Sequence, residues 1–394
     1  MTTFDVVQDL PKTYTFRNPP PSDLPTIAIL APCYGLERVS YMIPSACHRY
    51  IKLRRIPIHR LERRGTFLEQ TPIIFGPSVD LVHTFNHLPL NRNFVVSAEM
   101  ELPRYLGVTK KWEQKIGLQI LGSHRCRGIW PLSEAAFSYI ARRFSRAGYE
   151  RLSEKMVVFR GAVPPSVSCK QREPVKDRGP LKLLFVGGDG LRKGLGPTLE
   201  AARIMRTGGI DVQITVVGQP GAQTYVVPGA IFPTREISEC LASSDWVSHF
   251  PTLPNVRVRT LMETHDIFVL PTLDESLGWV FAEAAMSGLP SVTTNIFAIP
   301  ELVLDGLTGW TIKLALDEDR RWIHIGDRGG RDALVETQRY ICGELIRIIA
   351  GLFERRPAIS EYGERARDHI TALYNLEVAR LGLEKLYGSA ISRT

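Results

Sequence analysis

Long apolar runs are absent from this sequence. No stretch of about 18 consecutive apolar residues occurs among its 394 residues, and a helix needs roughly that length to cross a bilayer. The N-terminal MTTFDVVQDLPKTYTF has no basic start followed by an apolar core, so we also expect no signal peptide. Both absences favour a cytoplasmic protein.

Paired cysteines are absent as well. The six cysteines are scattered, with no CxxC and no histidine pair at the spacing of metal ligands. This argues against a zinc site and a disulfide framework and is typical of a reducing cytosol. Residues 317–319, DED, match a DxD metal motif, but we expect them to lie solvated in a charged loop. We therefore predict no metal and no cofactor.

The usual phosphate-loop motifs, GxxxxGK[ST] and GxGxxG, are missing from the glycine-rich loop GGDGLRKG at 187–194. Glycines such as Gly187 and Gly188 nevertheless let the backbone approach a ligand closely. Arg192 and Lys193, at the far end of the loop, can clamp a diphosphate. Taken alone, the same pattern fits an ordinary turn between a strand and a helix with two exposed cations.

Positive charge is concentrated in the first half of the chain. The net charge is +8, but residues 1–165 hold 23 Lys and Arg against 13 Asp and Glu, whereas the remainder holds 26 against 28. The first half therefore carries +10 and contacts an anionic surface such as lipid headgroups, or its basic clusters are simply solvated. Basic motifs interleaved with aromatic residues are not present, so nothing favours a nucleic-acid partner.

Apolar β-type segments alternate with helical patterns throughout the chain, which predicts parallel sheets with crossover helices. In the first half we expect helices at 39–55 and at 134–146, the second with Ser133 as its N-cap. The strands expected there are 25–31, 56–59, 81–84, 94–97, 129–131 and 156–159.

The same alternation restarts after a Pro-rich, charged segment that ends at residue 180. The expected order is a strand at 181–186, a helix at 196–206, a strand at 213–217, a helix at 237–243, a strand at 246–250, a helix at 258–264, a strand at 267–270, a helix at 278–287 and a strand at 291–294. Residues 359–387 form an amphipathic helical segment. The fold class is therefore α/β, with two doubly wound domains and a ligand cleft expected at the carboxyl ends of their strands.

Two glutamates mark the most informative segment, 268–309. Glu275 lies in the loop before the helix expected at 278–287, and Glu283 lies inside that helix. The start of a helix favours phosphate, because its first N–H groups have no partner within the helix. Glu275 can accept hydrogen bonds from sugar hydroxyls, and Glu283 can hold a ribose as acidic residues do in dinucleotide folds. The alternatives are a helix-start residue and an exposed charge, although Glu283 stands in the apolar run WVFAEAAM.

Taken in order, these motifs resemble those of the retaining GT-B glycosyltransferases of family GT4, the glycosyltransferase 1 group. The matching elements are FVGG…RKG at 185–194, VVG at 216–218, ESLG at 275–278, Glu283, GLP at 288–290, PE at 300–301 and DGLTG at 305–309. In the first half, VDLVHTFN at 79–86, IWPLSEAAFSYI at 129–140 and VVFRGAVPP at 157–165 match more loosely.

The resemblance implies a GT-B fold, two Rossmann-like domains that face each other across a cleft. The implied parts are an N-terminal extension at 1–24, an acceptor-side domain at 25–165, a linker at 166–180 and a nucleotide-sugar-binding domain at 181–358. A C-terminal helix at about 360–394 is expected to pack back on the acceptor-side domain.

The resemblance also implies a role for individual residues. Lys193 and Arg192 would neutralise the donor diphosphate, Glu275 would bind the donor sugar and Glu283 the nucleotide ribose. The complete donor-binding set is Gly35, Gly187, Gly188, Arg192, Lys193, Gly218, Glu275, Ser276, Leu277, Gly278, Trp279 and Glu283. The family's histidine after the fourth strand is missing, and Glu99 either takes a catalytic or acceptor role there or is a strand-end charge facing water.

The function implied is a metal-independent retaining glycosyltransferase. It would move sugar from a UDP- or GDP-sugar to a glycan or lipid-linked acceptor in bacterial surface polysaccharide or lipopolysaccharide synthesis. Peripheral contact with the inner face of an anionic membrane is a further expectation. The alternatives are a catalytically idle GT-B-like partner subunit, and another GT-B enzyme such as a sugar-nucleotide epimerase or a phosphorylase.

Overall fold

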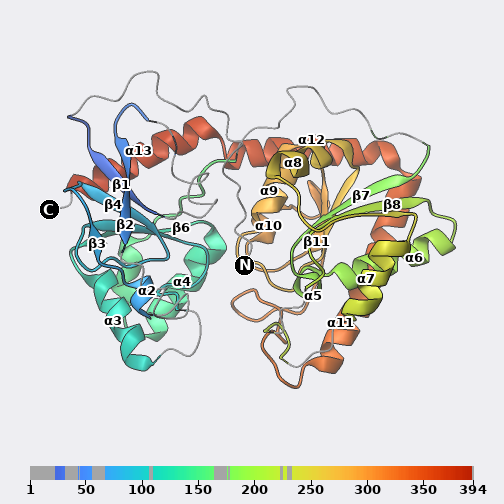
Figure 1. Ribbon diagram of the computed structural model, residues 1–394, viewed down its shortest axis with the longest axis horizontal. Coiled ribbons are helices and arrows are strands. Elements are labelled where there is room, and N and C mark those ends of the chain that lie inside the picture. The colour runs from blue at the N-terminus through green and yellow to red at the C-terminus, as the bar shows by residue number, and fades with distance from the viewer. Residues whose placement is uncertain are drawn as a thin grey trace. The chain divides into compact units, whose positions relative to one another are not determined.

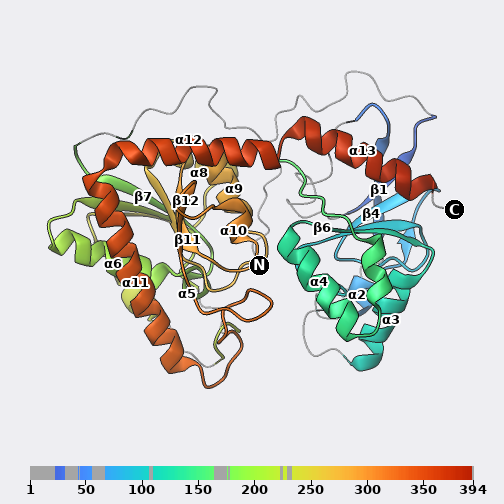
Figure 2. The same cartoon turned by 180° about the vertical axis from the view of Figure 1, so that it is seen from behind.

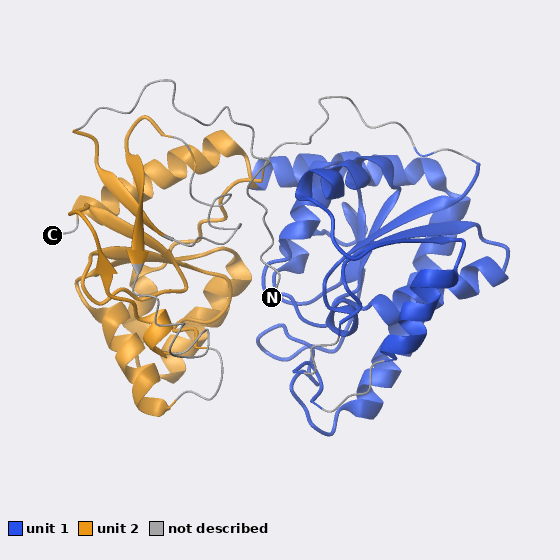
Figure 3. Cartoon of the chain, viewed as in Figure 1, with its two compact units in different colours: residues 1–6, 164–373 blue, residues 7–163, 374–394 orange. Residues whose placement is uncertain are grey.

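The computed structural model describes residues 23–31, 43, 45–55, 67–105, 110–163, 175, 178–221, 225–228 and 233–392. They divide into two compact units, each built on its own sheet (Figure 3). The described residues 175–373 belong to unit 1, and residues 23–163 and 374–392 belong to unit 2. Most of the expected N-terminal extension, most of the expected linker and Gly35 lie outside the described residues.

The sheet of unit 2 has six strands in the order β3-β2-β1-β4-β5-β6. All neighbours pair in parallel except β3, which runs antiparallel to β2. The strands are β1 (Thr26–Ala31), β2 (Arg49–Arg55), β3 (Ile74–Phe75), β4 (Leu81–Phe85), β5 (Phe94–Ala98) and β6 (Cys126–Pro131). Every residue of β4 and β5 is buried, as expected for central strands covered on both faces.

Several helices belong to the same unit as this sheet, and α4 has the bounds expected from the sequence. They are α2 (Phe67–Gln70), α3 (Lys111–Gly122), α4 (Glu134–Arg146), the 3-10 segment η3 (Glu150–Lys155) and α13 (Leu376–Ser392). The hydroxyl of Ser133 accepts a hydrogen bond from the backbone N–H of Ala136 at 3.0 Å, which confirms Ser133 as the N-cap of α4.

Two predictions for the first half are wrong. Residues 49–55 form strand β2 rather than a helix, because they pair in register with β1, with Thr26 opposite Arg49 and Leu30 opposite Leu53. This pairing overrides the helical pattern of the segment. Residues 156–159 form no strand, since Met156 makes only an isolated bridge to Ile129.

The sheet of unit 1 has the order β12-β11-β10-β7-β8-β9 and is parallel throughout (Figure 1). Its strands are β7 (Leu181–Val186), β8 (Val212–Val217), β9 (Val247–Phe250), β10 (Ile267–Leu270), β11 (Ser291–Thr294) and β12 (Gly309–Ile312). Counted within the unit, this is the order 3-2-1-4-5-6 of the dinucleotide-binding Rossmann fold. The order reverses between β7 and β10, so their carboxyl ends form the switch point where ligands bind in such sheets.

The helices of unit 1 cover this sheet, and the longest of them, α11, packs on α6, while α12 packs on α9 (Figures 1 and 2). They are α5 (Gly190–Lys193), α6 (Leu195–Thr207), α7 (Thr234–Ser243), α8 (Asn255–Thr264), α9 (Trp279–Met286), α10 (Ile299–Leu302), α11 (Arg331–Glu354) and α12 (Arg356–Leu373). The helices and strands predicted between residues 181 and 294 are confirmed within three residues at each end.

The helical pattern at 359–387 is confirmed, but it forms two helices instead of one. The break lies at Tyr374 and Asn375, where the side chain of Asn375 accepts the backbone N–H groups of Glu377 and Val378 at 2.9 and 3.0 Å. This cap starts α13, which belongs to unit 2, whereas α12 belongs to unit 1. Within the described residues, no helix is long and apolar enough to span a bilayer.

Candidate functional site

The candidate donor site of unit 1 is built from the loops that follow β7 and β10. These two strands are neighbours in the sheet, so the parallel arrangement brings residues 187–194 and 271–278 to the same edge. The side chains predicted for the diphosphate, Arg192 and Lys193, come from the first loop, and Glu275 comes from the second.

The loop after β7 approaches its neighbours closely through its backbone. The N–H of Gly187 donates to the carbonyl of Val217 at 2.9 Å, and a Cβ at Gly218 would overlap the carbonyl of Gly187. Gly218 also has φ = +139°, a conformation that only glycine adopts readily. By contrast, a Cβ on Gly188 would meet no atom within 4 Å, so packing does not require a glycine there.

The short helix α5 fixes the direction of the two cations. The side chain of Asp189 caps the helix by accepting the backbone N–H of Arg192 at 3.3 Å, and it also accepts Nε of the same arginine at 3.3 Å. The guanidinium of Arg192 then reaches across to the second loop, where Nη1 donates to the carbonyl of Asp274 at 2.9 Å.

Backbone contacts hold the two loops together at the same place. The carbonyl of Arg192 accepts the N–H of Leu273 at 2.7 Å and the hydroxyl of Thr272 at 3.1 Å. The chain turns at Gly194, where φ is +75° and a Cβ would overlap the carbonyl oxygen of Pro271. Only glycine permits this close approach without strain.

Lys193 and Glu275 form an ion pair at the centre of this arrangement. Their side chains are only 11% and 14% exposed, so the pair lies largely out of water, where charge interactions are stronger than at the surface. The structure therefore brings together three of the predicted catalytic residues, Arg192, Lys193 and Glu275.

Three residues that sequence reasoning missed join the same cluster. The carboxylate of Asp274 accepts the hydroxyl of Tyr225 at 2.9 Å and lies 3.4 Å from Nη2 of Arg321. Burial raises the pKa of the Tyr225 phenol, and the neighbouring Asp274 carboxylate raises it further, so Tyr225 stays a hydrogen-bond donor. Nε of Arg321 is buried and has no hydrogen-bond partner among the described residues.

The acidic turn before Arg321 explains its position. The side chain of Asp317 accepts the backbone N–H groups of Asp319 and Arg321, both at 2.9 Å. Residues 317–319 were expected to be a merely solvated loop, and they are also the turn that directs Arg321 towards Asp274. The only signal for this in the sequence was the adjacent basic pair Arg320 and Arg321, which carries no motif.

Helix α9 starts directly after the Glu275 loop, through Ser276, Leu277 and Gly278. Leu277 is buried, and Gly278 turns the chain with φ = +78°, where a Cβ would lie 2.7 Å from the ring of Phe281. The first helical residue is Trp279, so the helix begins four residues beyond Glu275. N–H groups in the first turn of a helix have no partner within it and favour anions.

Glu283 lies further along α9 and faces α8. Its Oε1 accepts Nδ2 of Asn255 at 3.4 Å. Burial raises the pKa of Glu283, while Asn255 and the nearby Arg259 act in the opposite direction. No hydrogen bond or ion pair joins Glu283 to Lys193 or Glu275 among the described residues, so Glu283 is not part of their cluster.

The acceptor-side candidate Glu99 belongs to unit 2 and follows β5. It forms an ion pair with Arg104 at 3.4 Å, with the glutamate side chain 19% exposed. The neighbouring Glu101 lies 3.4 Å from Arg143 and accepts the hydroxyl of Tyr139 at 3.2 Å. Both carboxylates are thus at the carboxyl end of a central strand, each beside an arginine.

Metal ligands are not grouped in the part of the chain that the structure describes. No cluster of three or more His, Cys, Asp or Glu side chains there has an arrangement that could hold an ion. The cationic side chains around Glu275 are the groups available at this site to meet a charged ligand.

Comparison with known proteins places the donor loops in a family. Residues 180–320 match the family model for "Glycosyl transferases group 1". We call this matching stretch, residues 180–320, the group 1 domain after the proteins that it resembles. The match includes the loops after β7 and β10, together with the turn at 317–319, and it confirms the family resemblance at the level of group 1.

Curated relatives of this group 1 domain cover only part of the chain. D-inositol 3-phosphate glycosyltransferase of Arthrobacter sp. (strain FB24) is 28% identical over 157 residues, 39% of this chain and 35% of that protein. Amylovoran biosynthesis glycosyltransferase AmsK of Erwinia amylovora is 27% identical over 169 residues, 40% of this chain and 38% of that protein. The chain thus spans little more than a third of the length of these relatives.

Solved structures extend the likeness of fold to nearly the whole chain. Anabaena HepE in complex with UDP-glucose superimposes with a TM-score of 0.55 over 92% of this chain and 99% of its own, at 13% identity. At this identity the match speaks for the fold alone. The predicted α/β fold class, GT-B with two Rossmann-like units, is confirmed.

Proposed function

We propose that this protein is a retaining GT4 glycosyltransferase that moves a sugar from a UDP- or GDP-sugar to a glycan or lipid-linked acceptor. The observation that carries the proposal is the cluster of Arg192, Lys193 and Glu275 at the switch point of the group 1 domain. A nucleoside diphosphate needs fixed cations beside the bond that breaks, and its sugar needs an acceptor of hydroxyl hydrogen bonds close by. This cluster offers both.

In the proposed mechanism, the ion pair of Lys193 and Glu275 exists only until the donor binds. When the diphosphate arrives, the ammonium of Lys193 turns from Glu275 to a phosphate oxygen, since charge-assisted hydrogen bonds to phosphate are strong. The released carboxylate of Glu275 accepts hydroxyl protons of the sugar. Arg192 and the start of α9 neutralise the remaining phosphate charge, with Gly187, Gly188 and Gly218 leaving room for the ligand.

The chemical step needs no group from outside the two substrates. The bond between the anomeric carbon and the phosphate oxygen breaks, and the acceptor oxygen bonds to that carbon on the same face. The acceptor proton passes to the departing phosphate oxygen, so a nucleoside diphosphate leaves. The protein contributes fixed positive charge where negative charge develops, which is the largest single effect in many enzymes.

We assign the ribose of the nucleotide to Glu283 and the acceptor to unit 2, with Glu99 or Glu101 beside it. UDP-sugars are the first donors to test, because the Anabaena structure with this fold holds UDP-glucose. The amylovoran relative supports a role in surface polysaccharide synthesis. The charge of +10 in residues 1–165 supports contact with an anionic membrane surface at the cytoplasmic face.

The test combines ligand binding and turnover. Thermal-shift screening against UDP-, GDP-, ADP- and CDP-sugars identifies the donor, and donor hydrolysis is then measured for the wild type, Glu275→Gln and Lys193→Ala. Each substitution should lower kcat by about 10²–10³-fold, as the loss of one electrostatic contact does. Lys182→Ala is the matched control, because Lys182 is an exposed lysine near the other end of β7. Near-wild-type rates in both site variants would refute the assignment.

A further inference from the structure

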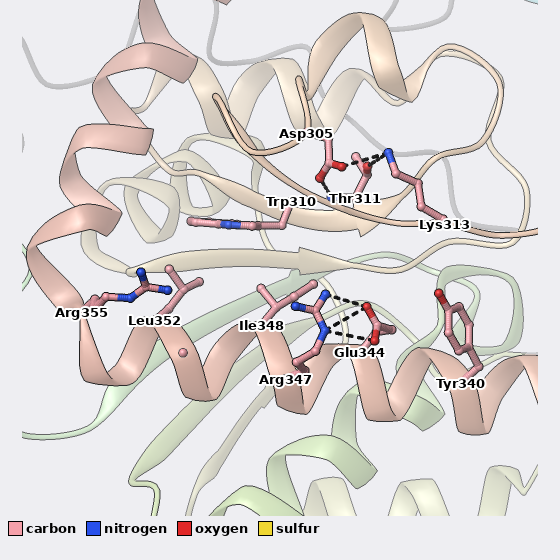
Figure 4. A pocket seen from close by; sticks show the side chains of 11 residues that line it. Asp305, Trp310, Thr311, Lys313, Tyr340, Glu344, Arg347, Ile348, Leu352 and Arg355 are labelled. Atoms are coloured by element: carbon pink, nitrogen blue, oxygen red, sulfur yellow. Dashed lines mark hydrogen bonds and ion pairs between the residues drawn. The ribbon is translucent and has the colours of Figure 1, made fainter.

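A cavity in unit 1 lies away from the donor loops, between β12 and α11 (Figure 4). β12 is the edge strand of the sheet, separated from β10 by β11. The cavity has a volume of about 270 Å³, slightly below the roughly 300–1,000 Å³ of pockets for drug-sized ligands. That size suits a single sugar residue.

Four of the five charged side chains of its walls form two ion pairs, and the fifth, Arg355, forms no ion pair among the described residues. Asp305 binds Lys313 at 2.9 Å on the strand side, and Glu344 binds Arg347 at 2.7 Å on the helix side (Figure 4). The walls thus carry two carboxylates and three cations, and offer hydrogen-bond acceptors and donors together. The carboxylates accept hydrogen bonds and the cations donate them, so these walls can serve a neutral ligand whose hydroxyls both donate and accept hydrogen bonds.

An aromatic surface completes the lining. The indole of Trp310 is supported by Tyr362, with ring centroids 4.3 Å apart. Figure 4 shows the indole edge-on above Leu352 and Arg355 of α11. An aromatic face beside paired polar groups suits a sugar ring, whose C–H face is apolar and whose hydroxyls project from the rim.

A glycine keeps the cavity open. Gly351 stands in the last turn of α11, and glycine is a poor helix former. A Cβ at this position would meet only Nη2 of Arg355, at 4.0 Å, so packing does not require a glycine. A longer side chain there would project into the cavity that Gly351 lines.

We propose that this cavity binds a neutral sugar residue of a glycan chain, at a site separate from donor binding. It would hold a growing or completed polysaccharide against the enzyme while the donor site works. The proposal does not depend on the donor chemistry, because the same cavity could hold a glycan whether or not the donor loops are active.

The test uses the full chain on an array of neutral, phosphorylated and sulfated oligosaccharides. Gly351→Leu, which places a side chain in the cavity, is compared with Gly343→Leu. Gly343 lies in the same helix, is exposed, meets no atom within 4 Å and does not line the cavity. Both variants should melt at or above the wild-type temperature. The pair Gly351→Ala and Gly343→Ala repeats the comparison with a smaller change if either leucine variant fails to fold.

We expect the wild type to bind at least one neutral glycan, Gly343→Leu to match it, and Gly351→Leu to lose at least tenfold in affinity. Glu275→Gln should bind the array as the wild type does, which separates this site from the donor loops. The proposal is overturned if no neutral glycan binds, if only phosphorylated or sulfated probes bind, or if both Gly351 variants bind as well as their Gly343 counterparts.

Discussion

Arg321 adds a third cation to the donor site, beside Arg192 and Lys193. The charged segment around it carries no recognisable motif, yet its guanidinium lies beside Asp274, the residue next to Glu275. One of its nitrogens, Nε, is buried without a partner among the described residues. A buried unpaired donor is costly, and a phosphate oxygen would satisfy it.

We therefore expect Arg321→Ala to weaken donor binding. Loss of one charge-assisted hydrogen bond, about 1.5–3 kcal/mol, corresponds to roughly 10–100-fold in the donor Kd. Isothermal titration with the donor found in the screen measures it. Arg328→Ala, an exposed arginine in the same segment, should leave Kd unchanged, and equal affinities for the two variants would exclude Arg321 from the site.

Two buried histidines of unit 2, His48 and His83, are expected to make its stability depend on pH. The ring of His83 binds the hydroxyls of Tyr387 and Ser97 at 2.7 and 2.9 Å. Burial, and then the neighbouring His48, hold the pKa of His83 well below its ordinary value. Burial also lowers the pKa of His48 to about 4, against the opposing effect of Glu384.

Acid should therefore destabilise unit 2. Above about pH 6.5 a histidine is neutral in both the folded and unfolded chain. Below that pH the unfolded histidine takes up a proton and the buried one does not, so stability falls until the pH reaches the folded pKa. The slope is about 1.4 kcal/mol per pH unit for each histidine.

Urea unfolding between pH 7.5 and 4.5, followed by tryptophan fluorescence, measures this slope. His48→Gln should lower this slope by the contribution of one histidine, about 1.4 kcal/mol per pH unit. His124→Gln, at an exposed position, should leave the slope as it is in the wild type. A profile that does not change with pH between 6.5 and 4.5 would contradict the expected neutral state of both rings.

At the scale of the elements, the junction of α5 and α6 decides whether the donor loops meet. Gly194 joins the two helices and touches Pro271 at the end of β10, with φ = +75°. Gly209 follows the other end of α6 with a similar φ of +88°, but it has open space around it. The two glycines share the same backbone requirement and differ only in what surrounds them.

Gly194→Ala and Gly209→Ala should thus have different effects. Each alanine costs about 1–2 kcal/mol for its left-handed backbone. Gly194→Ala adds roughly 1–3 kcal/mol more for the overlap with Pro271, and it moves Lys193 away from Glu275. Denaturant unfolding gives the stability, and donor affinity should fall for Gly194→Ala alone. Equal losses in both would mean that the two loops are not held together at this junction.

At the scale of the whole molecule, the chain returns to unit 2 after completing unit 1. Helix α13 buries Leu383, Tyr387 and Ala390, and Tyr387 binds His83 of β4. The C-terminal helix is therefore part of the core of unit 2, although about 210 residues of unit 1 separate it in sequence.

A chain that ends at Leu373 should lose the fold of unit 2 and keep that of unit 1. Limited proteolysis with mass spectrometry should then show rapid cleavage before residue 163 and a resistant fragment over 181–373. Leu381→Ser, which changes an exposed residue of α13 (53% exposed), should leave the full-length chain resistant throughout. Protection of both units in the truncated chain would show that α13 is dispensable.

The sequence by itself determined the α/β class, the strand and helix order of the group 1 domain and the donor loops with Lys193, Arg192 and Glu275. Apolar runs, glycines and charges close together in the chain carry that information locally. Only the tertiary structure decided the strand at 49–55, the place of Arg321 and Tyr225 at Asp274, and the division of 359–387 between two units. Each of these depends on pairing or packing with residues far away in sequence, and no local pattern encodes such a partner.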